Sequence, residues 1–229
     1  MFISKQNKIK WPLLIVATFI VAITVIFGVY RFDIPLYVWM QQFNTVVWRW
    51  FANIFDGKVW VIVFLLATII MYLKKTYELR NDPTTQMHWF NIKFLSRDAY
   101  AKLKNSNAFL VLCSLCLSGV IVEILKFIIG RARPMMFEWW GNIGYIFVPF
   151  NSEYWFNSMP SGHTALSFAG LVMLGMLMPR FRWLTWTLAI AIAVSRVAIG
   201  AHWPTDVILG AFIGMVSADF VLAIIRKIK

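Results

Sequence analysis

Long apolar runs separated by short polar segments make up most of the chain. Each run is about 15 to 21 residues long, and a helix of about 20 residues crosses the hydrocarbon core of a bilayer. We predict six such spans, at Trp11–Tyr30, Gly57–Leu73, Ala108–Leu125, Ser161–Met178, Trp183–Ile199 and Thr205–Ile225. The first run begins like a signal peptide, but it is longer than a usual cleaved segment and no small-residue cleavage site follows, so we expect it to be retained. The pattern predicts an all-α, polytopic membrane protein with six transmembrane helices.

The composition supports this class. The 229 residues are 60% hydrophobic and only 14% charged, which is more apolar surface than a water-soluble core of this size could hide. No repeat or low-complexity linker divides the chain, so we expect residues 1–229 to form a single integral-membrane domain. The net charge of +12 does not indicate nucleic-acid binding, because no soluble basic domain is present. The two cysteines, in "CSLC" within an apolar run, are expected to pack in a helix rather than to form a redox pair.

The positions of the basic residues predict the orientation in the membrane. Short loops rich in lysine and arginine stay on the cytoplasmic side. With the N-terminus inside, 15 of the 22 basic residues are cytoplasmic, namely Lys5, Lys8, Lys10, Lys74, Lys75, Arg80, Lys93, Arg97, Lys102, Lys104, Arg180, Arg182, Arg226, Lys227 and Lys229. Both termini are therefore predicted to be cytoplasmic, in a cell inner (plasma) membrane. The segment "SMPSGH", residues 158–163, then lies on the periplasmic or external side.

Three segments concentrate polar residues at this external face. They supply Lys126 and Arg133, then Ser161, Gly162 and His163, and finally Arg196, His202 and Asp206. Arginine binds anionic oxygens in a bidentate manner and lysine adds a point charge, so three cations with few nearby acids indicate an anion site. Ser161 is predicted to cap the helix that begins beside it, and Gly162 leaves backbone N–H groups open to the same anion. We interpret the three segments as a phosphate site.

The two histidines of this face are candidate catalytic groups. If residues 202 to 206 begin a helix, with Pro204 in its first turn, His202 and Asp206 lie on one face. The carboxylate can then hold one ring nitrogen as N–H and leave the other free to attack phosphorus. His163 could protonate the departing oxygen and later activate water. These residues indicate phosphoryl chemistry through a phosphohistidine.

Each residue also has a simpler explanation. Arg131, Arg133 and Arg196 could anchor helix ends by extending into the head groups, and either histidine could be an interfacial packing residue. A small transporter or lipid-binding membrane protein could hold an anion without chemistry. The pair of His202 and Asp206, with His163 on another span, favours catalysis because binding alone does not require it.

The same residues carry a family resemblance. They follow the pattern K-x6-R-P, P-S-G-H and S-R-x5-H-x3-D without a substitution, at Lys126, Arg133-Pro134, Pro160-Ser161-Gly162-His163, Ser195-Arg196, His202 and Asp206. The chain therefore resembles the type 2 phosphatidic acid phosphatase superfamily, and the six-span layout extends the resemblance over essentially its whole length. The resemblance implies that His202 is the nucleophile, Asp206 its orienting partner and His163 the acid and base. It also implies phosphate binding by Lys126, Arg133, Arg196 and the Ser161–Gly162 segment, with no metal or other cofactor.

The expected substrate is a phosphate carried by a membrane lipid. Aromatic residues crowd the loop from Met135 to Met159, which suits a belt at head-group level, either as plain anchors or in contact with substrate. Undecaprenyl pyrophosphate, phosphatidylglycerophosphate, phosphatidic acid and lipid A phosphate all fit, and transfer of the phosphate to another lipid instead of water remains open. Haloperoxidases share a related anion site but are soluble. The expected partners are the lipid substrate and the bilayer, with no nucleic acid and no obligate protein partner.

Four further features carry predictions. Glu123 lies one turn before Lys126 and is expected to hold it, whereas Asp219 in the last span has no predicted partner. The glycines of "GAFIG", residues 210–214, predict close helix packing inside the protein. The segment "MHWFNIKFL", residues 87–95, is predicted to lie along the inner membrane surface, with His88 far from the site.

Overall fold

The computed structural model describes residues 1–4, 6–54, 57–80, 103, 106–141 and 146–227. Its helices are α1 (Trp11–Arg31), α2 (Asp33–Gln41), α3 (Val46–Ile54), α4 (Gly57–Arg80), α6 (Asn107–Ile129), α7 (Pro134–Trp140), α8 (Gly162–Leu177), α9 (Arg182–Ala198) and α10 (Pro204–Lys227), with short 3-10 turns at Tyr154–Phe156 and Pro179–Phe181. Within these residues, β pairing is limited to the isolated bridges Ile3–Ile9 and Arg131–Phe147. The all-α prediction is confirmed for the described part of the chain.

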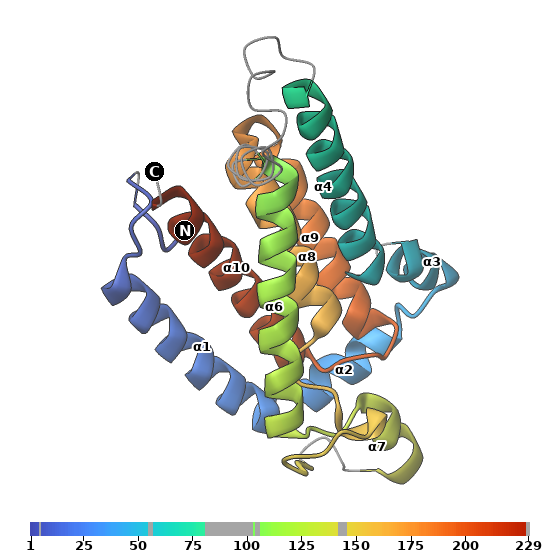
Figure 1. Cartoon of the computed structure of the whole chain (residues 1–229). Coiled ribbons are helices and arrows are strands. Elements are labelled where there is room, and N and C mark those ends of the chain that lie inside the picture. The colour runs from blue at the N-terminus through green and yellow to red at the C-terminus, as the bar shows by residue number, and fades with distance from the viewer. Residues whose placement is uncertain (5, 55–56, 81–102, 104–105, 142–145, 228–229) are drawn as a thin grey trace.

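Helices α1, α4, α6, α8, α9 and α10 occupy the six predicted spans (Figure 1). Among the described residues, five apolar helical segments are long enough to cross a bilayer. Helix α8 has 16 residues, or about 24 Å at the usual rise, against a hydrocarbon core of about 30 Å. A count of six full spans is therefore not confirmed. The chain enters the bundle before α8 begins, since Ser158, Met159 and Ser161 are at most 3% exposed in irregular backbone. This buried segment explains why α8 is short.

Helix α8 forms the centre of the bundle and packs against α6, α9 and α10. Its buried side chains Phe168 and Met173 share one hydrophobic core with Leu115 of α6 and Ile192 of α9. The close approach of α10 depends on two glycines, because a Cβ at Gly210 would lie 2.5 Å from the Ser161 carbonyl oxygen and one at Gly214 would lie 2.3 Å from that of Ala165. The predicted internal packing of "GAFIG" is confirmed.

The outer helices present apolar side chains to the surroundings. Phe19 and Ile23 of α1, and Ile70 of α4, are all more than half exposed. Side chains of this kind over whole helix faces are unfavourable in water and suit contact with lipid tails. In α6, both cysteines are free thiols; Cys113 packs against the core, as predicted, whereas Cys116 is exposed.

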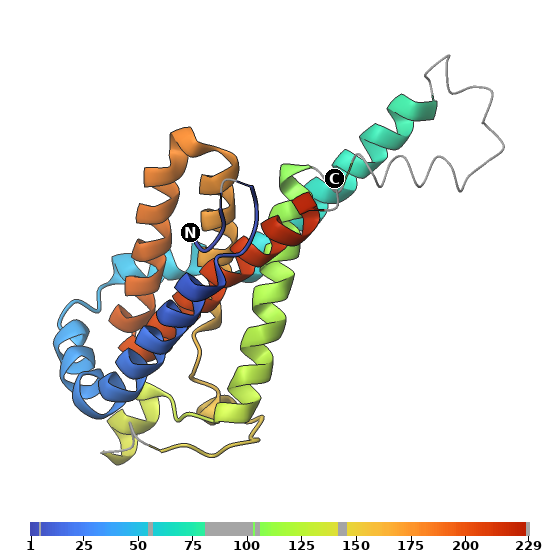
Figure 2. The same cartoon turned by 90° about the vertical axis from the view of Figure 1, so that its left-hand side faces the viewer.

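The first residues of the chain and the end of α10 lie at the end of the bundle opposite α7 (Figures 1 and 2). There the buried Asp219 finds the partner that the sequence did not indicate, because its Oδ1 accepts from the Met1 amino group at 3.2 Å and its Oδ2 from the Phe2 N–H at 2.6 Å. Which end faces the cytoplasm stays a prediction. The predicted surface segment at residues 87–95, with His88, lies outside the described residues, as do Lys5, Lys93, Arg97, Lys102, Lys104, Tyr145 and Lys229.

Candidate active site

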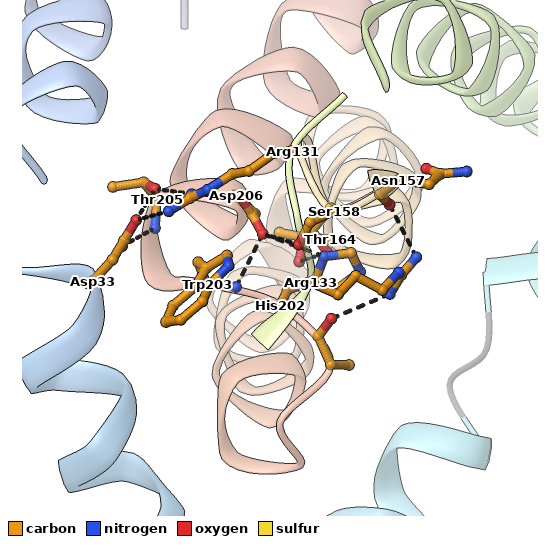
Figure 3. A network of polar contacts seen from close by, with 12 residues as sticks. Asp33, Arg131, Arg133, Asn157, Ser158, Thr164, His202, Trp203, Thr205 and Asp206 are labelled. Carbon is orange, nitrogen blue, oxygen red and sulfur yellow. Dashed lines mark hydrogen bonds and ion pairs between the residues drawn. The ribbon is translucent and has the colours of Figure 1, made fainter. Parts of the chain in front are cut away.

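The three polar segments of the sequence meet at the α7 end of the bundle (Figure 3). The Ser161 N–H donates to the Asp206 carbonyl oxygen at 2.9 Å, which joins the start of α8 to the first turn of α10. Arg133 Nη1 donates to the carbonyl oxygen of Ala201, next to His202, at 3.2 Å. The structure therefore brings together residues that are distant in the chain, such as Arg133 and Ala201, which lie 68 positions apart.

The segment after α6 is shaped by Gly130, which ends the helix in the left-handed conformation with φ of +58°. A Cβ at Gly130 would lie 1.7 Å from the Val148 carbonyl oxygen, so another side chain is excluded on both counts. Beyond it, the chain pairs with the returning loop through bonds from Arg133 N–H to Trp155 and from Ser158 N–H to Arg131. Arg131 and Arg133 are therefore held on extended backbone and project in different directions.

His202 lies in the α9–α10 connection, and Asp206 lies in the first turn of α10, which begins at Pro204 as expected. Nδ1 of His202 is 3.6 Å from Oδ2 of Asp206, an ion-pair distance that is too long for a hydrogen bond. The same carboxylate oxygen accepts from the Trp203 N–H at 3.0 Å, as the third-position acid of a capping box does. The carboxylate thus faces Nδ1 as the sequence predicted, and Nε2 is the nitrogen left for attack.

His202 is 2% exposed, and this burial lowers its pKa to about 3 because the charged imidazolium is poorly solvated there. The Asp206 carboxylate opposes this shift, whereas the positive charges of Arg133 and Arg196 add to it. The imidazole is therefore neutral throughout the physiological pH range. A neutral ring nitrogen is the form that can act as a nucleophile.

Arg133 is 8% exposed, and its guanidinium donates to three backbone carbonyl oxygens: Tyr154 at 2.9 Å, Asn157 at 3.0 Å and Ala201 at 3.2 Å. It also lies 4.1 Å from the centre of the Tyr154 ring. Burial lowers the pKa of Arg133 below its ordinary value, because carbonyl dipoles and a ring do not replace the hydration of a full charge. Three of its five N–H groups are used in this way, and two remain for an anion.

The start of α8 departs from one detail of the sequence prediction. Ser161 precedes the first residue of α8, but its side chain makes no capping hydrogen bond; its Oγ accepts from Thr164 Oγ1 at 3.0 Å instead. The predicted cap is wrong because the fully buried Ser161 hydroxyl is directed to a side chain rather than to the backbone of the first turn. Gly162 does lie beside Lys126: a Cβ added at Gly162 would be 3.5 Å from the Nζ of Lys126.

Lys126 is held by Glu123, with 2.9 Å between Nζ and Oε1, which confirms the predicted pair. His163 is the second residue of α8 and is half-buried. Arg196 lies in the last turn of α9, and its carbonyl oxygen accepts from the His202 N–H at 3.2 Å. All eight predicted residues thus lie on the segments that meet here, and their roles stay predictions.

The structure also places three residues at the site that the sequence did not indicate. Arg131 is fully buried and bonds to Asp206, which contradicts the alternative that it anchors a helix end in the head groups. Asp33 of α2 and Thr205 of α10 complete the same network. For Arg131 the available signal was a second arginine in the short segment between Gly130 and Pro134. Asp33 carries no such signal, because its partner lies 98 residues away.

Comparison with known proteins finds curated relatives that match part of the chain. Lipid A 1-phosphatase of Rhizobium etli is 40% identical over 97 residues, which cover 42% of this chain and 41% of that protein. Undecaprenyl-diphosphatase of Sulfolobus acidocaldarius is 33% identical over 102 residues, 44% of this chain and 47% of that protein. The matches therefore span less than half the length of these curated relatives.

The fold has a counterpart among solved structures. The crystal structure of Aquifex aeolicus LpxE covers 83% of this chain and 94% of its own length, with a TM-score of 0.52. At 18% identity, this likeness shows the fold alone. A sequence model of the PAP2 superfamily matches residues 107–229, which make up more than half of the chain. This matched region contains every residue of the three motifs. The chain belongs to the PAP2 superfamily.

Proposed function

We propose that this chain is a metal-independent lipid phosphatase that removes phosphate from a membrane lipid through a phosphohistidine on His202. The observation that carries the proposal is the buried, neutral imidazole of His202, with Asp206 facing Nδ1 and the guanidinium of Arg133 anchored beside it. A transporter or a simple lipid-binding protein needs cations to hold an anion. It does not need a histidine held against a buried carboxylate.

The chemistry follows from these positions. Nε2 of His202 attacks phosphorus, a P–N bond forms, and the P–O bond to the lipid breaks while His163 protonates the departing oxygen. The phosphorylated ring is positively charged, and the Asp206 carboxylate stabilises it. Water, deprotonated by His163, then attacks phosphorus, so that phosphate leaves and neutral His202 returns. Lys126, Arg133 and Arg196 neutralise the charge of the phosphoryl oxygens during both steps.

A lipid carrier for the phosphate is supported by where the site lies. It is at one end of a bundle whose outer helices expose apolar side chains, beside a loop in which Trp139, Tyr154 and Trp155 are exposed aromatics. The two curated relatives named above act, by their names, on lipid A and on undecaprenyl diphosphate. We propose a substrate of this class for the present chain, with phosphatidylglycerophosphate and phosphatidic acid as further candidates.

A panel of lipid phosphates tests the proposal. Purified protein in detergent should release inorganic phosphate from at least one of undecaprenyl diphosphate, lipid A, phosphatidylglycerophosphate and phosphatidic acid, in the presence of excess EDTA. His202→Gln should release none. The matched control is His88→Ala, because His88 is the one histidine of the sequence that is not among the proposed site residues. Loss of activity with EDTA and recovery with Mg²⁺ would contradict metal independence, and inactivity toward the whole panel would contradict the proposed function.

We further propose that the site faces the periplasm or cell exterior, because most basic residues lie on the segments at the other end of the spans. A reporter enzyme that is active only outside the cytoplasm should be inactive when it is fused after Lys229. The same reporter inserted after Gly141, which follows α7 at the site's end of the bundle, should be active. The reverse pattern would place the site at the cytoplasmic surface.

A further inference from the structure

We propose that Asp33 and Arg131 are positioning residues for catalysis: together they fix the Asp206 carboxylate, and through it the ring of His202. The inference rests on the proposed function, because it concerns the same nucleophile. It extends the site to α2, which precedes residues 107–229 and so lies outside the part of the chain that the superfamily match covers. Figure 3 shows the three charged side chains in a row, with Arg131 between the two carboxylates.

The guanidinium of Arg131 bonds to both acids at short distances. Nη1 donates to Asp206 Oδ1 at 2.7 Å, and Nη2 donates to Asp33 Oδ2 at 2.6 Å. All three side chains are at most 1% exposed. Charges this deeply buried are costly to desolvate and seldom add net stability over apolar side chains, so a role in holding a specific geometry is the better explanation for them.

Thr205 connects Asp33 directly to the start of α10. Its N–H donates to Asp33 Oδ1 at 2.9 Å, and its hydroxyl donates to Asp33 Oδ2 while accepting from Arg131 Nη1 at 2.7 Å. An acid from α2 therefore binds an N–H of the first turn of α10, where such groups have no partner within the helix. Thr205 precedes Asp206, so this contact fixes the backbone from which the Asp206 side chain extends.

The four contacts of Asp206 leave its carboxylate little freedom to turn. Oδ1 is bound by Arg131, and Oδ2 accepts from the Ser158 hydroxyl and the Trp203 N–H while it faces Nδ1 of His202. Without Arg131 on Oδ1, the carboxylate could rotate and remove Oδ2 from the imidazole. Arg131 therefore determines which oxygen faces the nucleophile.

Asp33 also determines how strongly Arg131 attracts Asp206. With both acids present, one positive charge is shared between two carboxylates, so Asp206 keeps negative charge to stabilise a positively charged, phosphorylated His202. If Asp33 is replaced by a neutral side chain, the whole charge of Arg131 acts on Asp206, and the attraction of Asp206 for the His202 ring falls. The expected consequence is a slower chemical step, with phosphate binding little changed.

Helix α2 also contacts α7, α9 and Trp203, the residue after His202, and these contacts do not involve Asp33, Arg131 or Asp206. The buried ring of Tyr37 packs 5.0 Å from that of Trp203, and its hydroxyl donates to Glu138 of α7 at 2.6 Å. Gln41 Nε2 donates to the Val197 carbonyl oxygen at 2.9 Å. These contacts offer a matched control, because Tyr37→Phe loosens α2 without altering the charges near Asp206.

The test compares Asp33→Asn with Tyr37→Phe in the full-length protein. With a nitrophenyl phosphate as substrate, Asp33→Asn should lower kcat by about 10- to 100-fold, the usual effect of removing an outer-shell partner, and leave KM within about twofold. Tyr37→Phe should keep kcat within about threefold. A wild-type kcat in folded Asp33→Asn would overturn the proposal, as would equal losses in the two variants.

A measurement without turnover separates this inference from the proposed function. In protein labelled with ¹⁵N-histidine, the His202 signals of the wild type should show Nδ1 protonated, facing Asp206, and Asp33→Asn should shift the tautomer population. An unchanged tautomer in that variant would overturn the inference even if the wild type is an active phosphatase. If Asp33→Asn shifts the tautomer but the wild type hydrolyses no phosphate ester, the positioning role is supported and the proposed function is contradicted.

Discussion

Arg131 and Arg133 are two residues apart and both are buried, but their guanidinium groups have different bonding partners (Figure 3). Arg131 is bound to the carboxylates of Asp33 and Asp206, so its charge is balanced within the protein. Arg133, on the other side of Asp206, is bound to three carbonyl oxygens and stacked on Tyr154. Its charge is solvated by these dipoles, and within the described part of the chain no carboxylate is hydrogen-bonded to it.

The difference indicates two functions for one residue type. An arginine whose charge is balanced by bound carboxylates holds other groups in place, whereas a buried arginine bound to neutral carbonyl groups favours the arrival of an anion. His202 lies between the two arginines: its ring faces Asp206, which Arg131 binds, and it follows Ala201, whose carbonyl oxygen Arg133 binds. The following predictions test this division, beginning with the residue that both sides share.

The largest effect is expected at His202. His202→Ala should lower kcat by about 10⁴-fold or more, because a catalytic nucleophile is lost, and it should form no phosphoenzyme. His163→Ala should still form the phosphoenzyme from a nitrophenyl phosphate, whose leaving group needs little protonation, and should accumulate it. Labelling with ³²P-substrate, quenched in alkali because phosphohistidine is acid-labile, distinguishes the two. Label on Ser161, or undiminished label in His202→Ala, would mean that the nucleophile is another residue.

Arg131→Met should chiefly reduce stability. It leaves the buried carboxylates of Asp33 and Asp206 without their cation, and breaking a buried pair in this way costs about 3–5 kcal/mol. The free energy of unfolding in detergent, measured by denaturant titration, checks this. Adding Asp33→Asn to Arg131→Met should restore part of the loss, since one of the two uncompensated charges is removed. Purely additive losses would show that the two acids do not share Arg131.

Arg133→Gln should chiefly reduce activity. Removing a cation that stabilises charge in the transition state costs about 10²–10³-fold in kcat/KM. The loss of stability should be smaller than for Arg131→Met, about 1–2 kcal/mol for the carbonyl hydrogen bonds that are lost. Lipid phosphate hydrolysis and unfolding titrations on the same preparations measure both quantities. If Arg133→Gln is the less stable variant and Arg131→Met the less active per folded molecule, the division is reversed.

The last prediction concerns pH. His202 has a pKa of about 3 in the folded protein against an ordinary value of 6.5, so between these values the unfolded chain binds a proton that the folded protein does not. Its contribution to stability is complete above about pH 6.5 and is lost as the pH falls toward 3. His202→Gln should therefore flatten the fall in stability over this window, by up to about 1.4 kcal/mol per pH unit. An unchanged slope would show that His202 is not buried as a neutral group.

The sequence predicted the six apolar helices, because burial in lipid imposes a run length that composition reveals; the bounds agree within a few residues, except that α4 ends at Arg80 and not at the predicted Leu73. It also predicted the segments that form the site, since the spacing within each motif is local, from Lys126 to Arg133 and from His202 to Asp206. It missed α2, α3 and α7, which are short helices between spans without a long apolar run. The length of α8 was overestimated, because hydropathy does not distinguish a helix that crosses the bilayer from one enclosed by its neighbours.

What the sequence determined by itself is the class of protein and the residue types available for chemistry. Apolar length and motif spacing are properties of residues that are close in the chain, so they can be determined without knowledge of the fold. What only the tertiary structure decided is how each charge is balanced. Whether an arginine meets a carboxylate or a carbonyl depends on side chains from distant segments, such as Asp33 for Arg131 and Tyr154 for Arg133. Because buried electrostatics depend on those few ångströms of distance, two arginines in the same short motif acquire opposite environments.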